Sequence, residues 1–325
     1  MDQTVGALSE REVLRRIAAR TGRSNAAIVG PGDDAAVLAQ AGAVVATTDT
    51  LVHGPDFRLA WSSGYDLGWK AAAVNLADVA AMGARPTGLL VALAMPDDTR
   101  ISFVEQLADG LREGCEALAP GCAVVGGDLT VSRTLTIAVT ALGDLEGRQP
   151  VLRSGARPGD VVAVAGELGL AGAGLAILFD RFRDAAGDPV PVDRALLGPG
   201  ESAALDAQLR PAPPIGLGPM AALAGATAMM DVSDGLALDA TRLAEASGVG
   251  LDIDPAALGA DPRQAIEGGE DHALLATFRD EPLPPGFRRI GRVVEGGAAP
   301  LSIGGRPYTG RGGWDPYADW DARVG

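Results

Sequence analysis

The sequence predicts a two-domain α/β protein, and three features lead to that prediction. Its 325 residues exceed the roughly 100–200 that one hydrophobic core usually serves. Short apolar runs typical of strands alternate with segments of helical periodicity. Glycine is abundant, with 45 residues, while aromatic residues make up only 4%, so close backbone packing and many turns replace large side chains. The turn-rich segment 154–160 places the domain boundary near residue 148, giving domains 1–148 and 149–325.

Three helices are predicted in the first domain. Apolar residues recur at helical spacing over 7–21, and acidic residues in the first turn favour a helix start there. The alanine-rich stretch 66–82 predicts a second helix that can pack tightly against a neighbour. Ser102 and Glu105 form a capping box, which predicts the start of a third.

Four strands are predicted in the same domain. Val44–Ala46 is expected to be a short buried strand that ends abruptly at Thr47. The apolar run 88–95 predicts a strand buried on both faces. A short strand at 122–125 is expected to end in a Gly-Gly-Asp turn, and the alternation over 134–141 predicts a half-exposed strand.

The second domain is predicted to open with a strand at 161–165. The Pro- and Gly-rich region 184–219 is expected to hold one short helix between long connections. A helix is expected after the motif Asp-Val-Ser-Asp-Gly at 231–235, and further strands at 248–254, 273–278 and 290–294.

Composition excludes several classes of function. A net charge of −15 argues against a nucleic-acid partner, since that affinity comes from Lys and Arg neutralising phosphates. Cys115 and Cys122 lack the spacing of a zinc site and are expected to be reduced core thiols. No run approaches the ~18–20 apolar residues of a membrane span, and the first residues lack the pattern of a signal peptide. A cytoplasmic protein with no membrane partner is expected.

Acidic residues recur where strands meet glycine-rich turns. The run 44–46 leads into Thr47, Thr48 and Asp49, and Gly126-Gly127 leads into Asp128. Carboxylates brought together repel one another, so a fold that gathers them needs a compensating charge, usually Mg²⁺. For any single Asp, a helix cap or a turn explains the residue equally well.

Two local patterns bear on this choice. Asn75 and Asp78 share one face of a very apolar helix, where a carboxylate needs a partner, and this favours a metal over a solvated face. Ser233 or Asp234 could simply be the N-cap of the following helix, which leaves Asp231 unexplained.

The acidic motifs, taken in order, resemble those of the thiamine-monophosphate kinase family. The resemblance rests on seven segments spread over nearly the whole chain: GDDAAVL (32–38), TTDTLV (47–52), KAAAVNLADVAAMGA (70–84), VVGGDLT (124–130), RSGARPGD (153–160), DVSDG (231–235) and GGED (268–271). The wider superfamily contains other ATP-dependent enzymes, such as aminoimidazole ribonucleotide synthetase and selenophosphate synthetase, and shares the fold and several of these motifs. GGED and the NLADVAAMGA form favour the kinase.

The resemblance implies a fold, a reaction and a set of site residues. It implies an N-terminal ATP- and metal-binding α/β domain whose sheet pairs across a homodimer, and a C-terminal α/β domain that closes a cleft. ATP and thiamine monophosphate would give thiamine diphosphate and ADP, with several Mg²⁺ ions. By position, the implied metal ligands are Asp34, Thr47, Thr48, Asp49, Asp78, Asp128, Asp231 and Asp234. The implied ATP contacts are Gly127, Asp128, Arg153 and Ser233, and the implied substrate contacts are Asp56, Glu270 and Trp314.

Physical reasoning agrees with that reaction. Both reactants are phosphate anions, so catalysis must offset their repulsion and align them for in-line transfer. The acceptor oxygen is already ionised near neutral pH, so no catalytic base beyond the metal ligands is expected, and Asp78, Asp128 and Asp231 are expected to matter most. GxxxxGK[ST] is absent, so Mg²⁺ would replace much of what a phosphate-binding lysine does, with Arg153 adding a fixed positive charge.

One departure and two alternatives remain. Family members often carry His in the loop after the TDT motif, where this chain has Asp56, so the substrate contact from this loop is open. One alternative is a sister synthetase of the superfamily that acts on another substrate. The other is a non-catalytic nucleotide- or metal-binding regulator, which loss of acidic positions would favour, and none is missing.

Overall fold

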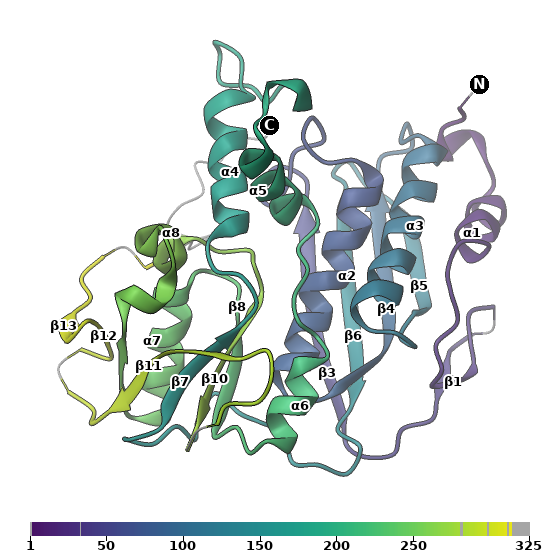
Figure 1. Cartoon of the computed structure of the whole chain (residues 1–325). Coiled ribbons are helices and arrows are strands. Elements are labelled where there is room, and N and C mark those ends of the chain that lie inside the picture. The colour runs from purple at the N-terminus through teal and green to yellow at the C-terminus, as the bar shows by residue number, and fades with distance from the viewer. Residues whose placement is uncertain (1, 33, 280–281, 298, 311, 314–325) are drawn as a thin grey trace.

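The computed structural model describes residues 2–32, 34–279, 282–297, 299–310 and 312–313. They form two larger sheets with helices packed against them, and Figure 1 shows the sheets side by side. This mixed α/β architecture agrees with the predicted fold class. The predicted boundary near residue 148 falls between the last strand of the first sheet and the first strand of the second, and the division into domains there stays a prediction.

The first sheet has the strand order β3-β6-β4-β5. Its strands are β3 (Val44–Val52), β6 (Thr136–Asp144), β4 (Arg85–Met95) and β5 (Val124–Val131). All pairs are antiparallel except β4 and β5, whose parallel pairing uses α3 (Ile101–Leu118) as the crossover. α2 (Gly64–Ala81) and α3 supply the main core with this sheet. α1 (Glu10–Ala18) packs on α3, and a short 3-10 turn (Val5–Ala7) and the hairpin of β1 (Ala27–Val29) and β2 (Val37–Leu38) complete this half.

Glycines bring α2 and α3 into backbone contact. A Cβ atom at Gly68 would lie 2.1 Å from the carbonyl oxygen of Leu107, and one at Gly110 would lie 2.1 Å from that of Tyr65. Only residues without a side chain allow this approach. The close packing expected from the glycine and alanine content is therefore found here, and it fixes where α2 sits.

The second sheet has the strand order β13-β12-β9-β11-β7-β10-β8, with β9 and β12 as its one parallel pair. Its strands are β7 (Val161–Ala165), β8 (Ala228–Val232), β9 (Gly250–Ile253), β10 (Ala273–Phe278), β11 (Arg288–Val294), β12 (Leu301–Ile303) and β13 (Arg306–Pro307). The helices of this half are α4 (Leu170–Arg181), α5 (Pro199–Leu209), α6 (Leu217–Leu223), α7 (Leu236–Ser247) and α8 (Pro262–Glu267), with 3-10 turns at Arg194–Leu196 and Pro255–Leu258. α7 and α6 belong to separate cores that use alternate residues of the central strands.

α2 joins the two halves. It packs on β3, β4 and β6 of the first sheet and also contacts α5, α6, β8 and β10 of the second half. Ala81 belongs to the core formed with Met229 and Leu274, and a Cβ at Gly218 of α6 would lie 2.1 Å from the Ala80 carbonyl oxygen. An alanine-rich helix is suited to this position because it can be buried on several sides at once.

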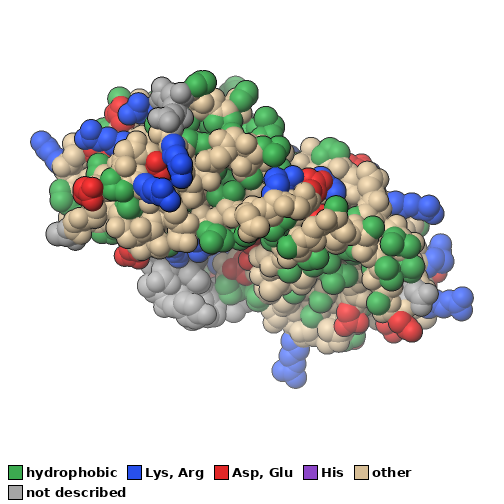
Figure 2. Space-filling model, turned by 90° about the horizontal axis from the view of Figure 1, so that it is seen from below, with side chains coloured by type: hydrophobic (Ala, Val, Ile, Leu, Met, Phe, Trp, Pro, Cys, Tyr) green, Lys and Arg blue, Asp and Glu red, His purple; other side chains and the backbone are tan. Residues whose placement is uncertain are grey.

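Several predicted elements are confirmed. β7 and β10 have the predicted bounds, and α1, α2, β4, β6, β9 and β11 lie at or near their predicted positions. Cys115 and Cys122 are buried free thiols, as expected. On the face in Figure 2, basic side chains are scattered among acidic, apolar and uncharged ones. Among the described residues, no helix is long and apolar enough to cross a membrane.

Two strand predictions were wrong. β3 does not end at Thr47 but continues to Val52 as an edge strand, and Val44 is 53% exposed. Its adjacent apolar residues point to opposite faces, so the run is not a buried one. β5 does not stop before Gly-Gly-Asp either, since it carries Gly126, Gly127 and Asp128 within its length.

Three helix predictions were also wrong. α3 begins at Ile101 after Arg100, and Ser102 donates its hydroxyl to the Asp2 carboxylate instead of capping the helix. α7 has Gly235 as its N-cap, so neither Ser233 nor Asp234 has that role. The region 184–219 contains the whole of α5 and the start of α6 as well as a 3-10 turn, not one short helix.

Candidate active site

Two sheet edges meet at α2. β3 is an edge of the first sheet and β8 an edge of the second, and α2 packs against both. The Thr47 hydroxyl donates to Oδ2 of Asp78 at 2.7 Å, and the backbone N–H of Asp49 donates to Oδ1 of Asn75 at 3.2 Å. The prediction that Asn75 and Asp78 share a helix face is confirmed, and that face lies against β3.

The second half supplies Asp231 near the end of β8. Asp231 and His272 are both buried, and Oδ2 of Asp231 lies 3.1 Å from Nδ1 of His272. Burial opposes a charge on His272, but the hydrogen bond and the negative charges of Asp231 and Glu270 outweigh it and raise the pKa of the imidazole. Nε2 of His272 is buried and has no hydrogen-bond partner among the described residues.

Carboxylates from the two halves act on one another. Burial, and next the charge of Asp231, raises the pKa of Asp78 to about 6. Burial also raises the pKa of Asp49, and the charge of Asp231 adds to this despite the opposing effect of His272. Two half-buried carboxylates whose charge is disfavoured by burial and by a third carboxylate are the electrostatic signature of a site that binds a cation or does chemistry.

The chemical groups of these residues are suitable ligands for magnesium. Buried carboxylate and hydroxyl oxygens are the donors that Mg²⁺ takes in proteins. Within the described ranges, however, no three His, Cys, Asp or Glu side chains stand close enough to hold one metal ion. The site is therefore a convergence of carboxylates from both halves and not a formed coordination sphere.

The GGED loop approaches the same region and is strained. Glu270 and His272 have φ values of 72° and 53°, which non-glycine residues rarely adopt. Between them, the Asp271 carboxylate accepts the backbone N–H groups of Gly169 and Ala171 at 2.6 and 2.9 Å, at the start of α4. Glu270 is ion-paired with Lys70 of α2 at 2.5 Å. The strained loop is thus held from α4 and from α2.

Other predicted ligands lie apart from this cluster. Thr48 of β3 and Asp128 of β5 lie on the sheet face opposite α2. Thr48 alternates with Thr47 and Asp49, which face α2, and Asp128 pairs with Ala92, which is exposed. Asp34 lies in the loop between β1 and β2, at the far side of the first sheet from β3 (Figure 1). Asp234 is ion-paired with Arg242 at 2.6 Å. The described chain therefore gathers Thr47, Asp49, Asp78 and Asp231, and not the whole predicted set.

The predicted ATP and substrate contacts are also spread out. Arg153 is exposed, and the neighbouring Leu152 carbonyl pairs with Met229 at the start of β8, away from Asp231. Gly127 lies within β5, and the Ser233 carbonyl accepts the N–H of Glu270. The Asp56 carboxylate accepts the Val52 N–H at 2.7 Å, closing the turn after β3. Trp314 lies outside the described residues.

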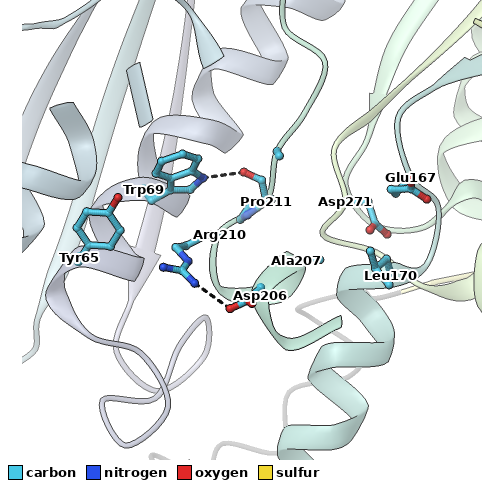
Figure 3. Close-up of a pocket in the computed structure, with 10 residues that line it drawn as sticks. Tyr65, Trp69, Glu167, Leu170, Asp206, Ala207, Arg210, Pro211 and Asp271 are labelled. Atoms are coloured by element: carbon cyan, nitrogen blue, oxygen red, sulfur yellow. Dashed lines mark hydrogen bonds and ion pairs between the residues drawn. The ribbon is translucent and has the colours of Figure 1, made fainter. Parts of the chain in front are cut away.

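A cavity of about 390 Å³ opens between α2 and the second half (Figure 3). Tyr65 and Trp69 of α2 face Arg210 and Pro211 there, and the Trp69 indole donates to the Pro211 carbonyl at 2.8 Å. Asp271 and Glu167 line the opposite wall. The cavity has aromatic and charged walls, and Asp271 of the GGED motif is one of the residues that line it.

Sequence reasoning missed two residues of the site, Lys70 and His272, and one buried carboxylate near it, Asp239. Lys70 opens one of the seven motifs but was not predicted to have a role, and its signal was its rarity in the sequence. His272 directly follows GGED, and its pairing with Asp231 joins residues far apart in the sequence. The pKa of Asp239 is raised to about 6 by burial and by the charge of Asp234. Nothing in the local sequence distinguishes Asp239 from an ordinary polar residue of a helix.

Comparison with known proteins places this architecture in a class. Residues 32–145 match the family model described as AIR synthase related protein, N-terminal domain, and residues 157–283 match its C-terminal domain. The chain is thus a two-domain AIR synthase related protein. It is 42% identical to a thiamine-monophosphate kinase of Mycobacterium tuberculosis over 98% of this chain and 94% of that protein, and 41% identical to one of Corynebacterium glutamicum over 90% and 88%. The chain belongs to the thiamine-monophosphate kinase family.

Solved structures agree with that membership. The Stenotrophomonas maltophilia thiamine-monophosphate kinase is 33% identical, with a TM-score of 0.77 over 93% of this chain and 98% of that chain. The Aquifex aeolicus enzyme is 34% identical, with a TM-score of 0.72 over 82% and 89%. A further structure, described as AaThiL complexed with AMPPCP and TMP, is 32% identical, with a TM-score of 0.73 over 93% and 94%.

Proposed function

We propose that this protein transfers the γ-phosphoryl group of ATP to thiamine monophosphate, giving thiamine diphosphate and ADP. The observation that carries the proposal is the meeting of Asp49, Asp78 and Asp231 at the junction of the two halves, in a chain of this family. The related structure described as complexed with AMPPCP and TMP supports the pairing of substrates. The reaction takes place in the cytoplasm, which supplies ATP and keeps the two buried thiols reduced.

The residues of this chain bind, orient and balance charge. Magnesium ions, when bound, neutralise the phosphate oxygens and the charge on the transferred group. Asp49, Asp78 and Asp231 hold them at the junction, and the acceptor phosphate needs no base because it is already ionised. The full proposed ligand set is Asp34, Thr47, Thr48, Asp49, Asp78, Asp128, Asp231 and Asp234. The proposed ATP contacts are Gly127, Asp128, Arg153 and Ser233, and the proposed acceptor contacts are Asp56, Glu270 and Trp314.

The spread of these residues supports a homodimer. Asp128 and Thr48 face away from α2, on a sheet face whose exposed residues include Leu90, 37% exposed, and Val44, 53% exposed. An apolar sheet face of this kind is suited to packing against a second copy. In such a dimer, Asp34, Thr48 and Asp128 of one protomer complete a site built on Asp78 and Asp231 of the other.

An ADP-release assay tests the proposed function. The enzyme is offered thiamine monophosphate, thiamine and aminoimidazole-pathway substrates in turn, with Mg²⁺ and after chelation. Of the acceptors offered with ATP, we expect only thiamine monophosphate to be turned over. The chelator should abolish this activity, and Mg²⁺ or Mn²⁺ should restore it. Faster ADP formation with unphosphorylated thiamine would contradict the proposed acceptor. Turnover confined to an aminoimidazole substrate would indicate a sister synthetase, and nucleotide binding without turnover would indicate a regulator.

A further inference from the structure

Lys70 is the only lysine in the sequence, among 27 basic residues. Arginine provides every other cationic side chain, including all those in the surface ion pairs. Lys70 is not a surface residue, since its side chain is only 7% exposed. Lysine is rarely buried without a partner, and it differs from arginine in its compact ammonium with three donors. At this position the chain thus buries an ammonium group, although arginine is its cation everywhere else.

The ammonium of Lys70 links α2 to two elements of the second half. Nζ lies 2.5 Å from the Glu270 carboxylate. The side-chain oxygen of Gln208 in α5 accepts from Nζ at 3.1 Å, in the amide orientation that also lets Gln208 donate to the Ala171 carbonyl at 3.1 Å. Both partners come from the second half, whereas Lys70 comes from the helix that packs on the first sheet. This contact fastens the GGED loop to α2.

Glu270 is the group whose position depends on Lys70. Its backbone is in the left-handed region, a conformation that persists only when surrounding contacts hold it. Burial opposes the charge of Glu270, but the Lys70 ammonium outweighs that effect and keeps the pKa of the carboxyl below its usual range. Lys70 and Asp78 are eight residues apart on α2, or roughly 12 Å along its axis. With the phosphates held at Asp78 in the proposed function, this separation leaves room for the rings of the acceptor to lie beside the ion pair.

We propose that Lys70 is a positioning residue for the acceptor: its ammonium holds the Glu270 carboxylate in place to receive the aminopyrimidine or the cationic thiazolium ring of thiamine monophosphate. The proposal rests on the proposed function. It gives the only lysine a role that arginine would fill poorly, because a longer planar guanidinium would hold the Glu270 carboxylate in a different position from that set by the compact ammonium.

The test compares Lys70→Met, Lys70→Arg, Glu270→Gln and the double variant Lys70→Met/Glu270→Gln with the unaltered enzyme. Arg85→Met, which breaks the exposed ion pair between Arg85 and Glu146, is the matched control. We measure kcat, the KM values for thiamine monophosphate and ATP, the calorimetric Kd of thiamine monophosphate, and the melting temperature.

Lys70→Met is expected to raise KM and Kd for thiamine monophosphate about tenfold, with kcat and the KM for ATP changed less than threefold. Lys70→Arg is expected to stay impaired, and the double variant to be no worse than Glu270→Gln, because Lys70 acts through Glu270. Arg85→Met is expected to leave both constants unchanged.

Three results would overturn the assignment. The first is an unchanged KM in Lys70→Met with a lowered melting temperature, which would make Lys70 purely structural. The second is a fully restored KM in Lys70→Arg, and the third is additive losses in the double variant. If Lys70→Met does not fold, an unchanged KM in Glu270→Gln would overturn the assignment in its place. Turnover of the unaltered enzyme with thiamine monophosphate tests the proposed function separately, so the two can fail independently.

Discussion

At the scale of single residues, the environment of Asp78 departs strongly from that of an ordinary aspartate. It sits on an almost wholly apolar helix, bonded to Thr47 and exposed to the charge of Asp231 across the junction. A carboxylate kept in so unfavourable a place by the fold indicates a function that needs its charge.

Asp78→Asn is therefore expected to lower kcat about 10²-fold or more, because a charge that holds metal at the transition state is lost. The fold should survive, since the Asn oxygen can still accept the Thr47 hydroxyl. Steady-state kinetics at ordinary Mg²⁺ and a melting curve check this. Asp98→Asn, at an exposed position, is the control. A near-normal kcat in Asp78→Asn would return this residue to a structural role.

Asp56 is expected to contact the acceptor while also closing its own turn. Asp56→Asn keeps an oxygen for the Val52 N–H but removes the charge, so it separates the two roles. We expect KM for thiamine monophosphate to rise several-fold, equivalent to about 1–2 kcal/mol, with KM for ATP unchanged. If Asp56→Asn leaves the KM for thiamine monophosphate unchanged and only Asp56→Ala lowers the melting temperature, Asp56 serves the turn alone.

Asp144 at the end of β6 is expected to make stability depend on pH. Its buried carboxylate accepts the N–H groups of Ala41, Gly42 and Glu146 at 2.6, 2.9 and 2.7 Å. Burial alone would raise the pKa of Asp144, but these three donors outweigh it and lower the pKa. A lowered folded-state pKa contributes stability above the unfolded pKa of ~3.9 and loses it as pH falls through the folded value.

Asp144→Asn should thus cost about 2 kcal/mol of unfolding free energy at pH 7, since one amide oxygen cannot serve three donors. The difference from the unaltered protein should shrink below pH ~4. Urea unfolding at pH 7 and pH 3 measures both. An equal difference at the two pH values would show that the charge of Asp144 contributes nothing.

At the scale of elements, the contact between α2 and α3 is expected to tolerate no added methyl group. In Gly68→Ala the new Cβ would lie 2.1 Å from the Leu107 carbonyl oxygen, so the helices must move apart at a cost of about 2–3 kcal/mol. Gly200→Ala, in α5 with no atom within 4 Å of the added Cβ, should be neutral or slightly stabilising. Chemical unfolding compares the two. Equal effects would show that the helices adjust freely.

Elements were predictable from sequence where one local pattern decides them. β7 and β10 are continuous apolar runs that are buried throughout, so their bounds were predicted correctly. α4 was missed because Gly172 and Gly174 suggest a loop, while the carboxylate at its start comes from Asp271, about a hundred residues later. β3 was misjudged because two adjacent valines can lie on opposite faces, and only the partner strand determines which face is covered.

The same limit applies to the candidate site. The sequence singled out Asp78, Asp49 and Asp231 by their residue type and surroundings, and the fold brings Asp231 near enough for its charge to act on the other two. It could not tell that Asp128 faces the opposite side of the sheet, because strand register is a property of pairing and not of one segment. The pairing of Lys70 with Glu270 has no local pattern either, because the two residues are two hundred positions apart in the sequence.

At the scale of the whole molecule, the proposed dimer makes a prediction about mixed enzymes. If Asp128 of one copy serves the site of the other, Asp78→Asn and Asp128→Asn are each inactive alone. Unfolding and refolding them together in equal amounts should restore about a quarter of the sites, because half of the dimers are mixed and each holds one intact site. The molar mass measured by light scattering checks that the refolded protein is a dimer. If the refolded mixture forms dimers but shows no activity, each site must be contained within one chain.

The position of the only lysine has a consequence for proteolysis. A lysine-specific protease has one bond to cut in this chain, after Lys70, and that bond lies inside α2, the helix buried between the two halves. Local fraying at termini and loops cannot present it, so cleavage requires α2 to come away from its neighbours. Each molecule would be cut once, into residues 1–70 and 71–325, and only when the core has opened. The chain thus carries its own reporter of large-scale unfolding.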